Sequence, residues 1–598
     1  MSFLKKLFAR RDTVIIISII LFFTKLFGFF KLRLIADQFG IDSELDIFWA
    51  AFLVPETIFN IIIAGTINAA VIPVFMDVRV KRGEQKLLKL FLVTSGAIAI
   101  FSMFMVFVLY VLTPGMSEFI LESGYLGSNL RVSAGEEEKA LLLLLVRIML
   151  LSPLFLSVSS IITAFLQVHR RFFVTALAPL LYNVGMIFGS IIFVGYYDMG
   201  VEGLAWAMVL GSMLHVAVQI PIVVKFVKIH LKIEHLEDIQ VRTKFYVTGL
   251  WEIIRLAVPR MLAFLGEQIS SVINTLIAFN IASGALSAFE YAMSLHLFPV
   301  QIFVSAFSLV ALPNLAEYFS RDKLDQFVTE FNKSLKQMMF IILPCVVAMV
   351  VLRLPIVRLV FSFEGNWTAT VVTAWSLALL AGSMIAQAGN AITLRGLFAL
   401  HETKLPLLVT VITIVVNIVC SYYLTNFFSH YVDWRPILSE LLIQIGSGLS
   451  PESSASLLDI ASSIQGDIWT WMTTRSASNA SVGGLALSLS IAFVVEMTLN
   501  MFFLNRKVAV LSWARTFKPI SLMMVNAFVM GAVMYFIYRL TDFSLDTTRT
   551  ANIILLFIVT AIVGGSVYLL LSYLSGLSEV SMVNKGIDFV RRKLKFAV

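Results

Sequence analysis

Charged side chains lie inside apolar segments near the start of the chain, where they could bind an anion. Lys25, Lys31 and Arg33 fall within one apolar segment, and Asp46 and Glu56 fall at the start of the next segment and inside it. A charge at the depth of a bilayer costs free energy, so each of these residues is a functional candidate by default. The cations suit a diphosphate, although lysine is a point charge without the fork of arginine. Together these residues predict a polar pathway for an anion inside a helical membrane protein.

Further ionisable or polar residues lie in later apolar segments. Arg260 and Glu267 are seven residues apart, so they share one helix face and could pair with each other or line a cavity. His296 is another candidate for the cavity. Glu496 is an isolated acid, and together with Asn417 it is our candidate for coupling to an ion.

Three further arginines in apolar segments are interpreted as structural residues. Arg147, Arg353 and Arg358 also lie in apolar segments. A long basic side chain can extend its charged end towards the membrane surface or pair with a neighbour. We therefore interpret these three as structural.

Enzyme signatures are scarce. The sequence contains no G-x-x-x-x-G-K-S/T phosphate loop, and its seven histidines lack metal-ligand spacing. No Ser–His–Asp arrangement can be argued either. We therefore expect no enzyme activity, no cofactor and no metal. A membrane transferase is a distant alternative, because its acidic residues would cluster in interfacial loops, whereas the charges here lie on helices.

Composition places the chain in a membrane. Of its 598 residues, 59% are hydrophobic and only 14% are charged, whereas a soluble domain carries about 25% charged residues. Only helices or closed barrels satisfy the backbone in lipid, and the apolar segments are too long for barrel strands. The fold class is therefore an all-α polytopic membrane protein with about fourteen transmembrane helices. The segments run approximately over 13–38, 46–76, 88–113, 139–167, 172–197, 201–227, 249–280, 284–317, 337–363, 369–398, 404–427, 482–505, 515–540 and 550–575.

The distribution of Lys and Arg in the loops predicts the orientation, because cytoplasmic loops are enriched in both. Basic loops at 79–86, 169–171, 225–244, 321–336, 401–404 and 506–518 alternate with loops poor in Lys and Arg at 42–46, 118–139, 198–202, 362–367 and 541–549. This alternation predicts that both termini are cytoplasmic. The net charge of +8 is then mostly a topology signal with attraction to anionic lipid, and we expect no nucleic-acid partner.

The segments also predict a division of the chain. We expect an N-lobe at 1–227, an amphipathic cytoplasmic linker at 228–248, a C-lobe at 249–505 with an external insertion at 430–481, a pair of helices at 506–575 and a cytoplasmic amphipathic tail at 576–598. Two six-helix halves with a site between them are a common transporter plan.

Several sequence motifs, taken in order and spacing, resemble one known family. They are LFGFFK (26–31), DIFWAAFLVPETI (46–58), ALAPLLYNVGMI (176–187), LAWAMVLGSMLHVAVQIP (204–221), EQISSVINTLIAFNIASG (267–284) and ALPNLAEYF (311–319). Over about 1–430, the chain resembles the lipid II flippases of peptidoglycan synthesis, the MurJ/MviN family. That family belongs to the multidrug/oligosaccharidyl-lipid/polysaccharide exporter superfamily.

The resemblance implies a fold and a mode of action. It implies two six-helix lobes around a central cavity, with two C-terminal helices that form a lipid-facing groove for a polyprenyl tail. A lipid-linked precursor would pass from the cytoplasmic to the outer leaflet by alternating access, driven by the membrane potential or by a gradient of Na+ or H+. The implied location is the bacterial cytoplasmic membrane, and the implied partners are membrane lipids and cell-wall synthesis proteins.

This chain departs from the family pattern in the cavity. Family arginines are replaced by Lys25 and Lys31 in the first helix. An arginine and a glutamate are replaced by Phe59 and Ala64 in the second helix, and an arginine is replaced by Ser294 in the eighth.

One family acid and several possible substitutes are nevertheless present. Asp46 matches the acid, and Arg33, Arg260, His296 or Glu267 could compensate for the missing charges.

These features leave several functions open. The first is a flippase for a polyprenyl-diphosphate cell-wall precursor. The alternatives are an exporter of another lipid-linked glycan or amphiphile, and a transport-inactive scaffold of the envelope machinery.

Overall fold

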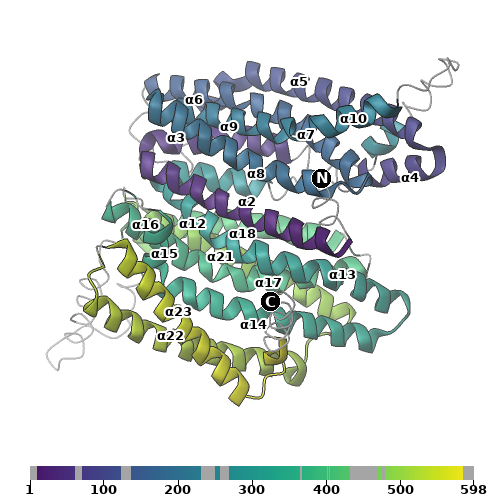
Figure 1. Cartoon of the computed structure of the whole chain (residues 1–598). Coiled ribbons are helices and arrows are strands. Elements are labelled where there is room, and N and C mark those ends of the chain that lie inside the picture. The colour runs from purple at the N-terminus through teal and green to yellow at the C-terminus, as the bar shows by residue number, and fades with distance from the viewer. Residues whose placement is uncertain are drawn as a thin grey trace, which may run out of the picture. The chain divides into compact units, whose positions relative to one another are not determined.

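Helices are the only regular secondary structure in the described part of the chain. The computed structural model describes residues 10–60, 71–122, 136–230, 249–255, 268–361, 363, 366–400, 402, 404–430, 443, 465, 469–474, 478–547 and 549–582, and these contain no strand. They form two compact units, Met1–Ser287 and Ala288–Val598 (Figure 1). The predicted linker at 228–248 lies almost wholly outside the described residues, so the division into lobes stays a prediction.

The first unit contains the N-terminal helices. They are α2 (Arg10–Phe39), α3 (Ser43–Phe59), α4 (Ile72–Arg82), α5 (Glu84–Glu122), α6 (Glu136–Met149), α7 (Leu151–Val168), α8 (Phe172–Gly189), the π-helix η3 (Ser190–Tyr196), α9 (Gly200–Ala217) and α10 (Ile220–His230). The first unit also contains the short apolar helix Gln268–Phe279. A core of apolar side chains from α4, α5 and α7 packs around Phe75, Phe91 and Phe165.

The second unit contains the helices from α12 onward, and α12 begins just before it. They are α12 (Ala285–Pro299), η5 (Val300–Val304), α13 (Ser305–Ser320), α14 (Leu324–Val351), α15 (Arg353–Val360), α16 (Trp367–Ala381), α17 (Ser383–Ala399), α18 (Lys404–Ser429), α21 (Ser481–Lys507), η7 (Trp513–Phe517), α22 (Lys518–Ser544) and α23 (Thr550–Leu574). Helices α22 and α23 lie side by side at the C-terminal end of the chain (Figure 1).

The predicted helical membrane fold is confirmed. Ten helices within the described residues are long and apolar enough to span a membrane, and the predicted number of fourteen stays a prediction. Several helices extend beyond their predicted spans. For example, α14 begins at Leu324 rather than at 337, and α5 has 39 residues. At 1.5 Å per residue, α5 is about 58 Å long, which exceeds the thickness of a bilayer.

Charged side chains form hydrogen bonds at the C-terminal end of α7. The Arg79 guanidinium donates hydrogen bonds to the Val168 carbonyl at 2.6 Å and to Glu84 at 2.6 Å. His169 Nε2 lies 2.8 Å from the other oxygen of Glu84. This cluster satisfies a carbonyl that the helix end would leave unpaired and ties the turn between α4 and α5 to α7.

Asp46 fixes the start of α12. Its fully buried carboxylate accepts the Gly284 N–H at 2.7 Å, and the N–H and hydroxyl of Ser287 at 2.8 and 2.7 Å. The first N–H groups of a helix have no partner within it, and they carry partial positive charge. Gly284 has φ +80°, and a Cβ there would lie 2.5 Å from the Ile41 carbonyl oxygen, so this approach requires glycine.

Helices α18 and α21 approach each other closely at a glycine. A Cβ on Gly484 would lie only 2.4 Å from the Leu424 carbonyl oxygen. Small residues permit such contacts between membrane helices. About one helical turn from Gly484, the hydroxyls of Ser421 and Ser488 are 2.6 Å apart. The contact between α18 and α21 therefore combines close packing with a hydrogen bond.

We predict that Asp46→Ala destabilises the protein by about 3 kcal/mol, because buried N–H groups at the start of α12 lose their acceptor. Thermal unfolding in detergent measures this loss. The matched control is Glu44→Gln, which alters an exposed acid in the first turn of the same helix, α3. Equal stability of the two variants would contradict the role of Asp46.

We also predict that Gly484→Ala lowers stability by about 1–3 kcal/mol, since the added methyl group would force α18 and α21 apart. Gly565→Ala is the control, because a Cβ there meets nothing within 4 Å. Thermal unfolding of both variants provides the comparison. If Gly565→Ala proved the more damaging change, the close approach of α18 and α21 would not limit stability.

Candidate functional site

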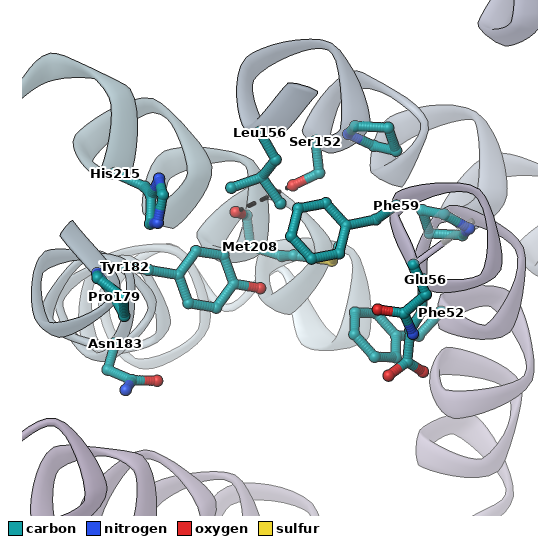
Figure 2. A pocket seen from close by; sticks show the side chains of 13 residues that line it. Phe52, Glu56, Phe59, Ser152, Leu156, Pro179, Tyr182, Asn183, Met208 and His215 are labelled. Atoms are coloured by element: carbon teal, nitrogen blue, oxygen red, sulfur yellow. Dashed lines mark hydrogen bonds between the residues drawn. The ribbon is translucent and has the colours of Figure 1, made fainter. Parts of the chain in front are cut away.

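A cavity of about 340 Å³ lies within the first unit, among α3, α7, α8 and α9. It is lined by Phe52, Pro55, Glu56, Phe59, Asn60, Ser152, Pro153, Leu156, Pro179, Tyr182, Asn183, Met208 and His215. The lining is mostly apolar, with a few polar groups that face one another across the space (Figure 2). Such a lining is typical of sites that bind small organic groups.

Glu56 is the acidic group of this cavity, and its charge interacts with that of Lys31. Lys31 extends from α2, is half-buried, and interacts electrostatically with the Glu56 carboxylate. Within the described residues, neither forms a hydrogen bond or an ion pair within 4 Å. The ammonium group of Lys31 is therefore near an acid that it does not contact directly, which leaves its N–H donors available to an anion.

Tyr182 and Asn183 contribute polar groups from α8 to the lining of the cavity. The Tyr182 hydroxyl points into the cavity (Figure 2). Asn183 Nδ2 donates to the Thr24 carbonyl of α2 at 3.1 Å. This bond links α8, which lines the cavity, to the helix that carries Lys31.

A chain of hydrogen bonds ends at His215. Thr163 Oγ1 donates to Gln219 Oε1 at 3.1 Å, and Gln219 Nε2 donates to Ser159 Oγ at 2.8 Å. Ser159 Oγ is in turn 2.7 Å from His215 Nδ1. Since Ser159 already accepts from Gln219, its hydroxyl can donate to Nδ1, which leaves the hydrogen of a neutral imidazole on Nε2. His215 then presents an N–H donor on the cavity side.

The groups that line the cavity suit the polar part of an organic ligand that also carries an anionic group, rather than a metal ion. No group of three or more His, Cys, Asp or Glu residues that could hold a metal ion occurs in the described part of the chain. The cavity instead offers one carboxylate, hydroxyl and amide groups, and the rings of Phe52 and Phe59. These groups could orient a ligand that has both polar and apolar faces.

The other candidates of the first unit lie in different settings. Lys25 is exposed. Arg33 forms an ion pair of 3.6 Å with Asp37, one helical turn further along, and Asp46 holds the start of α12. Three further positions, Arg260, Glu267 and Ala64, lie outside the described residues.

His296 is buried in the second unit. Gln387 Nε2 donates to His296 Nε2 at 2.9 Å, and Ser383 Oγ is 3.3 Å from the same nitrogen. Within the described residues, His296 Nδ1 has no hydrogen-bond partner. Nearby on α12, the Ser294 hydroxyl donates to the Glu290 carbonyl at 2.9 Å.

The two candidates for ion coupling lie on different helices, Asn417 on α18 and Glu496 on α21. Asn417 is buried between α18 and α21, where its Oδ1 accepts from Ser421 at 3.3 Å and from Ser488 at 3.4 Å. Glu496 is half-buried, eight residues beyond Ser488 on α21, which corresponds to about 12 Å along the helix. The contacts of Asn417 favour a packing role.

Sequence reasoning missed Tyr182, Asn183 and His215. A Tyr–Asn pair inside the apolar run ALAPLLYNVGMI was a usable signal, because polar residues at membrane depth need partners. His215 had no such signal, since its partner Ser159 is 56 residues away.

Comparison with known proteins identifies the family. A sequence model of the family described as "Lipid II flippase MurJ" matches residues 35–432, about two-thirds of the chain. A relative from Buchnera aphidicola (subspecies Acyrthosiphon pisum), named "Probable lipid II flippase MurJ", is 27% identical over 422 residues, 70% of this chain and 78% of the relative. A "Lipid II flippase MurJ" from Burkholderia cenocepacia is 23% identical over 405 residues, 67% of this chain and 76% of the relative.

Solved structures share the fold. A structure described as "Lipid II flippase MurJ, inward closed conformation" has a TM-score of 0.65 at 20% identity, covering 94% of this chain and 98% of its own. An inward-facing multidrug transporter of the MATE family and the MOP superfamily has a TM-score of 0.56 at 15% identity, covering 81% and 94%. The matched family region begins after Lys25, Lys31 and Arg33. With about two-thirds of its length matched by one family model, this multi-pass membrane protein belongs to the lipid II flippase MurJ family.

Proposed function

We propose that the protein is a flippase that moves a polyprenyl-diphosphate-linked cell-wall precursor, lipid II, from the cytoplasmic to the outer leaflet. The observation that carries this proposal is the family match over 35–432. The relatives that bear the name lipid II flippase are matched over about three-quarters of their own lengths. The substrate is therefore inferred from membership of the family, and the cavity supplies the chemistry.

Lys31 is our candidate for binding the diphosphate. In the empty protein, Glu56 compensates part of the charge of Lys31 inside an apolar region. A diphosphate would offer a stronger, multiply charged partner and hydrogen-bond acceptors, so binding would replace the interaction between Lys31 and Glu56. A ligand shifts a conformational equilibrium only through such a difference in contacts. Lys25, six residues earlier on α2, would supply a second cation.

The cavity would receive a polar part of the substrate. Tyr182, Asn183 and His215 supply donors and acceptors on the α8 and α9 side, while Phe52 and Phe59 supply apolar surface on the α3 side. A sugar or a short peptide presents both kinds of surface. Its hydrogen bonds would fix orientation, and the apolar contacts would contribute binding energy.

Alternating access would supply the movement. The similar solved structures include a MurJ described as inward closed, and MATE transporters described as inward-facing and outward-facing. In this chain, we propose that both termini are cytoplasmic in the bacterial inner membrane and that Na+ or H+ couples through Glu496. Cell-wall synthesis proteins would act as partners that deliver or consume the lipid.

A second candidate function has one specific observation in its favour. Phe59 faces the cavity where the family resemblance places an arginine. Losing a charge-assisted contact to a diphosphate costs on the order of 1.5–3 kcal/mol. An exporter of another lipid-linked glycan or amphiphile would need fewer such contacts.

Complementation tests the proposed function. We expect this chain to restore growth of a bacterium that has been depleted of its own lipid II flippase. Lys31→Ala should lower that activity about tenfold or more, since it removes a charged contact to the diphosphate. Lys86→Ala, an exposed lysine at the start of α5, is the control and should grow as wild type.

Membrane insertion of each variant is checked by surface labelling and immunoblotting. Growth failure of the correctly inserted wild-type chain would count against lipid II as the substrate and favour the second candidate or a scaffold. Growth of wild type with full activity of Lys31→Ala would preserve the function and refute the proposed diphosphate contact.

A double-mutant cycle tests the electrostatic coupling itself. We predict that Lys31→Met and Glu56→Met destabilise the protein by less together than the sum of their separate effects, with a coupling of about 1–2 kcal/mol, because each single change leaves one charge uncompensated. Thermal or denaturant unfolding in detergent measures all four proteins.

The control cycle uses Asp77 and Lys81, an exposed ion pair of 2.7 Å on α4. Exposed pairs on one helix typically contribute about 0.3–0.5 kcal/mol. Strict additivity at Lys31 and Glu56, with a larger coupling at the exposed pair, would show that the two buried charges do not stabilise each other.

A further inference from the structure

A second cavity lies in the other unit, where the ends of four helices meet. It has a volume of about 280 Å³ and is bounded by α15, the first residue of α16, the last turns of α22 and the first turns of α23. Arg358, Trp367, Tyr538 and Asp542 supply its polar lining. The remaining side chains are mostly aliphatic. None of its lining residues belongs to the cavity among α3, α7, α8 and α9.

Charges of both signs converge on the Tyr538 hydroxyl. Arg353, Arg358 and Arg539 interact with it electrostatically, and so does Asp542. Of these charged groups, Arg358 and Asp542 line the cavity itself, so its wall carries one positive and one negative group beside an apolar surface.

The charged groups keep most of their hydrogen-bonding capacity. Arg353 donates to the Val350 carbonyl at 2.8 Å, and Arg358 donates to the Thr547 carbonyl at 2.7 Å. A guanidinium group has five N–H donors. Within the described residues, Arg353, Arg358 and Asp542 form no ion pair within 4 Å. Donors and a carboxylate are therefore available to a ligand at the same place.

Helix ends surround the cavity. Helix α15 ends at Val360, α22 ends at Ser544 and α23 begins at Thr550, which predicts that the cavity lies at a membrane boundary. Trp367 is 57% exposed at its rim, and tryptophan favours the headgroup level of a bilayer. The adjoining loops, at 362–367 and 541–549, are poor in Lys and Arg, which predicts the outer face.

We propose that this cavity binds the headgroup of a zwitterionic phospholipid in the outer leaflet. The phosphodiester would accept hydrogen bonds from Arg358, which lines the cavity, since a guanidinium group suits phosphate oxygens. The ammonium group of the lipid would pair with Asp542. The glycerol and upper acyl chains would lie on Pro355, Ile553 and Leu556, which line the same cavity.

The location and the mixed charge favour this ligand over others. A purely anionic lipid would satisfy Arg358 and leave Asp542 without a cation. A free phosphate would leave the aliphatic lining uncovered. A zwitterionic headgroup on a lipid satisfies both signs of charge and the apolar wall.

Native mass spectrometry of the full chain in detergent tests the proposal. Phosphatidylethanolamine and phosphatidylglycerol with identical acyl chains are titrated separately, each with and without excess inorganic phosphate. We expect tighter binding of phosphatidylethanolamine, without competition by phosphate. Arg358→Gln should weaken both lipids about tenfold, the loss of one charge-assisted contact. Arg515→Gln, which removes an exposed arginine at the opposite end of α22, should match wild type.

Asp542→Asn tests the ammonium contact separately. It should abolish the preference for phosphatidylethanolamine while phosphatidylglycerol binds as well as before or better. Because Asp542 forms no ion pair among the described residues, we expect Asp542→Asn to fold. It therefore tests the proposed lipid site even if Arg358→Gln does not fold. An unchanged preference in Asp542→Asn, equal binding by Arg358→Gln and Arg515→Gln, or full competition by inorganic phosphate would each overturn the proposal.

Discussion

The absence of water inside a bilayer governs this structure, because every polar group at that depth must find its partner within the protein. Asp46 illustrates the constraint. Its carboxylate would be costly alone, and so would the first N–H groups of α12, yet together they satisfy each other through Gly284 and Ser287. The same constraint explains why Asn417 is bonded to hydroxyls where α18 meets α21. Polar residues thereby fix which helices pack and at what level.

The proposed transport site departs from this rule in a useful way. Lys31 and Glu56 influence each other without direct contact, so neither is as well satisfied as Asp46. A binding site needs such groups, since a fully paired cation would have to break its own ion pair before it could bind a diphosphate. Arg33, which is paired with Asp37, is less available for this reason. The proposed binding residues, Lys31 and Glu56, therefore differ from Asp46 and Arg33 in one respect: their charges have no directly bonded partner among the described residues.

Much of the fold and a smaller part of the site could be predicted from the sequence. Long apolar runs predict membrane helices because lipid permits few other structures, and charges in those runs made Lys31 and Glu56 candidates for the site. The contribution of His215 could not be predicted, since its network joins residues of α7 to the end of α9. Helices that are apolar on all sides do not reveal which face meets which neighbour. The pairing of Arg33 with Asp37 was predictable from their spacing of four residues.

Movement of lipid II across a bilayer is the central claim, and transport by the purified protein measures it most directly. The full chain would be reconstituted into liposomes that carry fluorescent lipid II, and a membrane-impermeant reagent would report how much of the lipid becomes accessible outside. The account predicts protein-dependent movement of lipid II that a polyprenyl glycan without the diphosphate does not share. Liposomes in which lipid II stays inaccessible, or in which both lipids move equally fast, would contradict it.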